Sequence, residues 1–166
     1  LFASHPPSDE RVADNQKTLA EIGAGGDLGT ERYAQRIAAL SAAKPAYDKY
    51  DKALAAAGKK DFAGARKLAA EAATLLPREG RFEQLQGDTL LAEKQPAAAL
   101  PHYERAIALN PGYYGSYLGG GTAQYRLGNK PKAREWLQKS HDLLPTAPSA
   151  YFLGLLAREG GDASGA

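Results

Sequence analysis

Small and apolar positions recur along this chain with a period of 34 residues. The period is plainest at Pro77, Pro111 and Pro145, because each proline closes a helical run of small and apolar residues. A repeat of this length accommodates two short helices and two tight turns, so stacked helix–turn–helix units are predicted. The predicted repeats span 46–79, 80–113 and 114–147, and a further repeat begins at 148.

Three positions of the repeat hold small residues, and we expect helices to cross there because larger side chains would force them apart. They are the eighth (Ala53, Gly87, Gly121), the twentieth (Ala65, Ala99, Ala133) and the twenty-seventh (Ala72, Ala106, Ser140). The thirtieth position always holds leucine, and we expect these leucines to fill the core just before the proline. They are Leu75, Leu109 and Leu143.

Two further helices are predicted ahead of the repeats. One covers residues 8–22, and the glycine-rich stretch 23–29 then forms a flexible connector. The second covers 30–44, where Pro45 is expected to end it and to start the first repeat. Apolar residues that share a face are Val12, Leu19 and Ile22 in the first helix and Tyr33, Ile37 and Leu40 in the second.

Composition narrows the function classes. The net charge of +2 is too small to indicate nucleic-acid binding. The absence of cysteine excludes disulfide and thiolate chemistry, and no apolar run approaches the roughly 18 residues of a membrane span. Because the chain opens on Leu1 without a methionine, we expect it to be a piece of a longer protein.

The repeat resembles the tetratricopeptide repeat over residues 46–147, with the first helix of another repeat at 148–158. This resemblance implies an all-α protein, an α-α superhelix preceded by one or two linker helices. Tyrosine occupies the fourth position in the later repeats, whereas the first two depart from this pattern. The four residues are Lys49, Glu83, Tyr117 and Tyr151. The alternative fold is an irregular helical bundle in which the proline spacing is accidental.

In stacked helix pairs the first helices line the concave face, which gives a candidate peptide-binding groove. Its predicted residues are Tyr47, Tyr50, Leu54, Arg81, Gln84, Asp88, Leu91, Leu118, Thr122, Tyr125, Arg126, Phe152 and Leu156. Aromatic side chains interspersed with arginine are typical of binding surfaces. The alternative is that some of these aromatics belong to the core. The fifth repeat position lacks the lysine and asparagine of chaperone-tail-binding repeats, so capture of a C-terminal carboxylate is not expected.

The opening residues Ser4-His5-Pro6-Pro7-Ser8-Asp9-Glu10-Arg11-Val12 resemble the segment that follows the catalytic core in HtpX-type zinc metallopeptidases. Periplasmic proteases of the BepA type place tetratricopeptide repeats after such a segment. The resemblance implies three parts: the tail loop and last helix of a metallopeptidase domain (1–22), a linker with a connecting helix (23–44), and the tetratricopeptide domain (45–166). It also implies a periplasmic location, or a membrane-associated one on the outer side.

The zinc site of that family is not encoded in this chain. It needs HExxH, whereas the histidines here are His5, His102 and His141, none four residues from another. We therefore expect no catalytic residue, no metal site and no cofactor in this chain, and zinc only in the parent protein. His5 is a candidate auxiliary zinc contact in that parent; the alternative is that it packs at a helix start.

The predicted function is a non-catalytic interaction module that binds partner or substrate proteins, including envelope proteins, for the protease domain of the parent. The alternative is a stand-alone adaptor that assembles protein complexes. The apolar residues of the last helix, including Tyr151 and Phe152, lack a polar cap, so self-association through that helix is also predicted.

Overall fold

The computed structural model describes residues 8–22 and 29–160. Within these residues there are eight α-helices and no strand. The helices are α1 (Ser8–Ile22), α2 (Thr30–Gly58), α3 (Phe62–Leu75), α4 (Gly80–Ala92), α5 (Pro96–Leu109), α6 (Tyr114–Arg126), α7 (Lys130–Leu143) and α8 (Ala147–Glu159). The chain divides into two compact units, 1–39 and 40–166, and α2 crosses the boundary between them.

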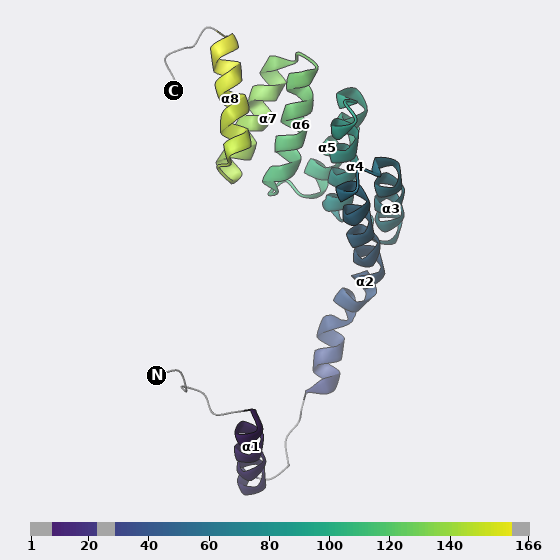
Figure 1. Ribbon diagram of the computed structural model, residues 1–166, viewed down its shortest axis with the longest axis vertical. Coiled ribbons are helices and arrows are strands. Elements are labelled where there is room, and N and C mark those ends of the chain that lie inside the picture. The colour runs from purple at the N-terminus through teal and green to yellow at the C-terminus, as the bar shows by residue number, and fades with distance from the viewer. Residues whose placement is uncertain (1–7, 23–28, 161–166) are drawn as a thin grey trace. The chain divides into compact units, whose positions relative to one another are not determined.

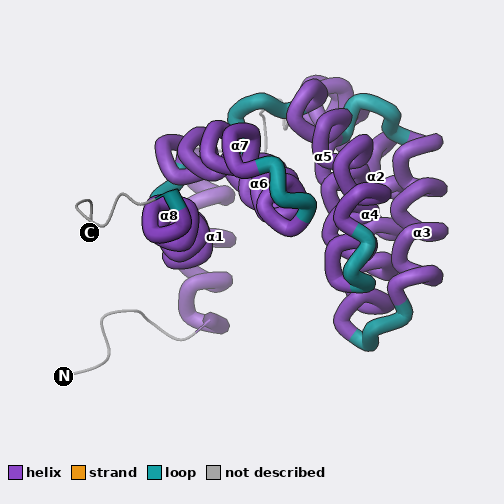
Figure 2. Tube along the Cα trace, turned by 90° about the horizontal axis from the view of Figure 1, so that it is seen from above, coloured by secondary structure: helices purple, strands orange, loops and turns teal. Residues whose placement is uncertain are grey.

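Consecutive helices of the second unit pack side by side (Figure 1). Seen from above, α4, α6 and α8 form an inner row, and α3, α5 and α7 form an outer row (Figure 2). The end of α2 packs against both α3 and α4, through Ala46 and Ala53. The predicted all-α superhelix of helix pairs is therefore confirmed.

The small residues lie where the helices meet, as predicted. Ala65, Ala99 and Ala133 are all 0 % exposed, and the twenty-seventh position of each repeat is equally buried. A Cβ atom added to Gly87 would lie 3.0 Å from the Tyr103 ring, and one added to Gly121 would lie 2.7 Å from Leu137 Cγ. Any larger side chain at these crossings would have to displace a neighbouring helix.

The predicted leucine plugs before the prolines are wrong. Leu75 is 52 % exposed and Leu143 is 36 % exposed, while Leu109 is half-buried. In the first repeat it is the next residue, Leu76, that packs against the core cluster around Phe82. Successive helical residues point about 100° apart, so two adjacent leucines cannot both face the core.

The predicted break at Pro45 is also wrong, because α2 continues through this proline. The φ of proline is compatible with a helix, but the ring removes the hydrogen bond that its nitrogen would have donated to the preceding turn and crowds the carbonyl group there. Burial holds the helix together beyond this point, since Ala46 and Ala53 are almost completely enclosed by α3 and α4. The connecting helix and the first helix of the first repeat are thus one element.

Ion pairs explain why the first two repeats depart from tyrosine at the fourth position. Lys49 Nζ lies 2.5 Å from Glu71 Oε2, which lowers the pKa of the Glu71 carboxyl. One repeat later the polarity is reversed: buried Glu83 lies 3.1 Å from Arg105 Nη1 and 2.8 Å from His102 Nδ1. Each pair joins the fourth to the twenty-sixth repeat position, so charge pairing replaces aromatic packing there.

Three residues with positive φ, one in each repeat, close the turn between paired helices: Lys60 (φ 64°), Lys94 (φ 61°) and Gly128 (φ 79°). A residue with a side chain pays about 1–2 kcal/mol to adopt the left-handed conformation, and glycine does not. Glycine instead loses more backbone entropy on folding, which reduces its advantage by about 0.5–1 kcal/mol. Lys60→Gly is therefore expected to raise the free energy of unfolding by about 0.5 kcal/mol, measured by urea denaturation. The neighbouring Lys59→Gly, without positive φ, should lower it; equal effects would contradict the prediction.

Candidate functional site

The first group of predicted groove residues forms an aromatic cluster between α2 and α4. The Phe82 ring centroid lies 5.8 Å from that of Tyr47 and 5.2 Å from that of Tyr50. Both tyrosines are half-buried, and Tyr47 donates its hydroxyl hydrogen to Glu79 Oε2 at 2.5 Å. This bond and burial raise the pKa of Tyr47. The cluster presents ring surface and fixed polar groups together, as aromatic binding sites do.

A hydrogen-bond network continues from this cluster along α4 and ties three helices together. Asp88 Oδ1 accepts the Tyr103 hydroxyl at 2.7 Å, and Asp88 Oδ2 accepts the Gln84 amide at 3.3 Å. The Ser116 hydroxyl on α6 donates to Gln84 Oε1, at 3.4 Å. Asp88 keeps an exposed surface, yet the surrounding helices displace enough of its hydration to raise the pKa of its carboxyl. Asp88 is thus a groove-facing acceptor held in a fixed position.

The second group lies between α6 and α8. The Tyr125 and Phe152 ring centroids are 5.4 Å apart, and both residues are half-buried. Tyr125 donates its hydroxyl hydrogen to Glu159 Oε1 at 2.6 Å, and Lys130 Nζ lies 2.9 Å from Glu159 Oε2. These two partners lower the pKa of Glu159. On the same helix Tyr151 is 63 % exposed; self-association through α8 stays a prediction.

The remaining predicted residues are divided between core and surface. Thr122 is buried and donates its hydroxyl hydrogen to the Leu118 carbonyl at 2.8 Å, and Leu118 packs on a core cluster that includes Leu156. These three side chains therefore stabilise the repeat stack and offer little to a ligand. Three of the remaining residues have exposed side chains: Leu54, Arg81 and Arg126. The charge of Arg81 opposes the burial that raises the pKa of Tyr50, so Arg81 lies close to the first aromatic cluster.

Two residues of this surface were missed because only first helices were considered. Glu79 and Tyr113 both occupy the last position of a repeat, just before a first helix begins. Glu79 accepts the Tyr47 hydroxyl. Burial raises the pKa of Tyr50, and nearby Tyr113 and Asp88 add to the effect, so Tyr113 lies close to the groove. The last position of the third repeat holds Ala147, so no recurrence in the sequence identifies these two residues.

His102 and His141 make interhelical contacts. His102 Nδ1 lies 2.8 Å from Glu83, and His141 Nδ1 lies 3.0 Å from Ser149 Oγ. His5 lies outside the described residues. In the ranges 8–22 and 29–160 no group of three or more His, Cys, Asp or Glu could hold a metal ion. The helices in these ranges are also too short or too polar to cross a bilayer.

Comparison with known proteins identifies the repeat. Residues 90–158 match the family model of the tetratricopeptide repeat. A search of curated proteins found no match. The predicted tetratricopeptide repeat is therefore confirmed by the family model over residues 90–158.

Three solved structures share the fold at low sequence identity. The first tetratricopeptide domain of Spaghetti (RPAP3) bound to the HSP90 peptide SRMEEVD has a TM-score of 0.69 and 17% identity, covering 72% of this chain and 95% of that one. The Sgt2 tetratricopeptide domain from Aspergillus fumigatus has a TM-score of 0.68 and 18% identity, covering 72% and 81%. The second domain of human RPAP3 in complex with the HSP70 peptide SGPTIEEVD has a TM-score of 0.63 and 16% identity, covering 67% and 93%. At these identities the likeness concerns the fold.

Proposed function

We propose that the second unit binds an extended segment of a partner protein along its row of first helices. The observation that carries this proposal is the pair of aromatic clusters, Tyr47–Tyr50–Phe82 and Tyr125–Phe152, in which every ring except the buried Phe82 is half-buried. Rigid aromatic rings give large contact areas at a small entropic cost, and such side chains dominate binding energies at interfaces. Asp88 lies on α4, the helix that carries Phe82 of the first cluster, and it offers an acceptor to a backbone N–H of the segment.

Neighbours of the same fold support a peptide ligand, because two of them hold peptides of HSP90 and HSP70. The ligand proposed here differs in how it is held. The fifth repeat position carries Tyr50, Gln84, Leu118 and Phe152, none of which is cationic. A C-terminal carboxylate therefore has no lysine to meet in the middle of this row, and aromatic contact replaces it as the main source of affinity.

We further propose that this module belongs to a longer zinc metallopeptidase of the HtpX/BepA type, in the periplasm or on the outer side of a membrane. The support is the segment of residues 4–12, together with the repeats that follow it. The module would hold partner or substrate proteins, such as envelope proteins, for a protease domain, with His5 as an auxiliary zinc contact there. No catalytic step is assigned to the residues of this chain.

The alternative is a stand-alone adaptor. An HExxH motif in the coding sequence upstream would support the protease, and its absence would leave the adaptor.

The groove is tested by selecting random displayed peptides on the full chain and measuring the affinity of the enriched ones by calorimetry. Tyr50→Ala and Tyr125→Ala are each expected to weaken binding at least about tenfold, because each removes the ring that anchors a cluster. Tyr33→Ala is the matched control, since Tyr33 is 65 % exposed and lies in the other unit. Urea denaturation of each variant separates lost binding from lost folding.

Two outcomes would contradict the proposed groove. A library that yields no enriched peptide would argue against a peptide-binding surface altogether. Enriched peptides that bind both folded groove variants as well as they bind the wild type would place the binding surface elsewhere on the chain.

A further inference from the structure

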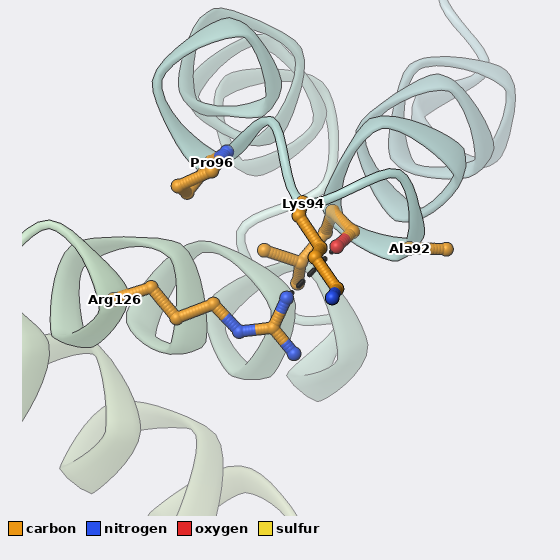
Figure 3. A pocket seen from close by; sticks show the side chains of 5 residues that line it. Ala92, Lys94, Pro96 and Arg126 are labelled. Atoms are coloured by element: carbon orange, nitrogen blue, oxygen red, sulfur yellow. Dashed lines mark hydrogen bonds between the residues drawn. The ribbon is translucent and has the colours of Figure 1, made fainter.

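A separate pocket lies at the end of the inner row, where α4 and α6 finish and α5 begins. It is lined by Leu91, Ala92, Lys94, Pro96 and Arg126, and its volume is about 430 Å³. Figure 3 shows Arg126 and Lys94 extending toward each other, from α6 and from the turn after α4. The pocket therefore combines an apolar wall with two cationic groups and has no carboxylate in its lining.

Arg126 is fixed in this pocket by the backbone of the neighbouring repeat. Its Nη1 donates to the Leu91 carbonyl at 2.8 Å. A guanidinium group has five N–H donors in a planar array, so most of them are left for a ligand. The positive charge of Arg126 also lies near Tyr103, where it opposes the burial that raises the pKa of that tyrosine. One hydrogen bond thus positions the group while its charge and remaining donors stay available.

No acidic side chain of the described residues is paired with the second cation, Lys94. Its ammonium group has no hydrogen-bond or ion-pair partner there. The adjacent Glu93 is engaged by Arg66, with Nη1 and Oε2 2.6 Å apart. Asp88, on the preceding helix α4, accepts from Tyr103 and Gln84. Lys94 also adopts a positive φ of 61°, a conformation that a lysine rarely adopts.

We propose that this pocket binds the carboxylate of an acidic side chain, Asp or Glu, in the partner segment held by the aromatic clusters. The inference rests on the proposed function and adds a second, charged contact to it. The carboxylate accepts two parallel N–H bonds from Arg126 and lies beside the Lys94 ammonium. The methylene groups of the acidic side chain pack against Leu91 and Pro96, which a bare inorganic anion could not exploit.

The probe is the set of peptides enriched on the wild-type chain in the display selection. They are expected to share an acidic residue at a constant spacing from an aromatic or apolar anchor. Replacing that residue by its amide, Glu→Gln or Asp→Asn, should weaken binding to the wild type about tenfold in calorimetry. Toward the Arg126→Gln and Lys94→Gln variants the acidic and amide peptides should bind within about threefold of each other. Arg134→Gln, at an exposed arginine outside the pocket, is the control and should keep the full preference.

A peptide with an amidated C-terminus distinguishes the two possible sources of a carboxylate. Its affinity should be unchanged; a loss as large as that of the side-chain amide would mean that the pocket takes the C-terminal group instead, and would overturn the proposal. Enriched peptides without a shared acid, or an acid preference that survives in both pocket variants, would also overturn it while leaving the aromatic groove intact. A library without any enrichment would overturn the groove and the pocket together.

Discussion

Tyr103→Ala is expected to lower the free energy of unfolding by about 3–5 kcal/mol, the usual cost of emptying a buried aromatic site. Tyr103 is 0 % exposed and lies in a core cluster with Ala99, Ala123 and Trp136. Its ring lies against glycines of both α4 and α6, so its removal leaves a cavity that extends from the second repeat to its junction with the third. Urea denaturation of the variant and the wild type, at equal pH and salt, measures the difference.

Tyr103→Phe is the control that keeps the ring and removes only the hydroxyl. It should cost about 1–2 kcal/mol, since the hydrogen bond to Asp88 is lost while packing is retained. A loss for Tyr103→Ala no larger than that for Tyr103→Phe would contradict the assigned role of the ring in joining the repeats.

The wild type and Tyr103→Phe are also expected to differ in how their free energy of unfolding depends on pH. Burial raises the pKa of Tyr103 far above its ordinary value of about 10, so the native state keeps a proton that the unfolded chain releases in alkali. The stability from this group is complete below pH of about 10 and falls as pH rises above it. The decrease should be shallower in Tyr103→Phe, although Tyr47, Tyr50 and Tyr125, whose pKa values are also raised, keep part of it.

The period of the sequence was enough to predict the helix pairs and their crossings. Two helices cross closely in every repeat, and each crossing needs a small residue. This need is visible in the sequence as the recurring alanines Ala65, Ala99 and Ala133. Features that belong to one repeat leave no such recurrence. Phe82 is a fully buried centre of the first aromatic cluster, yet the equivalent position of the next repeat holds Ser116. A period-based argument cannot find a residue of this kind.

The candidate groove was predictable as a surface but not as a set of contacts. The first helices do bring Tyr50 to Phe82 and Tyr125 to Phe152. Which side chains remain exposed depends on how far each helix is rotated toward its neighbour, and this rotation placed Thr122 inside the core. The rotation of a helix depends on the size of the side chains that it meets on neighbouring helices, so the helix register alone does not predict it.

In the glycine run of α6, the neighbouring side chains determine whether a substitution stabilises or destabilises the protein. Gly120→Ala is expected to lower the free energy of unfolding by about 1–3 kcal/mol, although alanine is the better helix former by about 1 kcal/mol. A Cβ atom at Gly120 would lie 2.4 Å from Trp136 Cζ3 and 3.2 Å from Tyr103 Cβ. Trp136 is buried and Tyr103 is fully enclosed, so neither ring can retreat without opening the interface between α5, α6 and α7. The shift of the urea midpoint at unchanged slope measures the loss.

Gly154→Ala is the matched control, because Gly154 is also inside a helix, α8, but a Cβ atom there would meet nothing within 4 Å. It should raise the free energy of unfolding by about 0.5–1 kcal/mol, through helix propensity alone. The two substitutions add the same methyl group to the same kind of backbone, so opposite signs isolate the contact with Trp136 and Tyr103. If both variants were stabilised, α6 would have room to shift away from α7, and the close crossing described here would be contradicted.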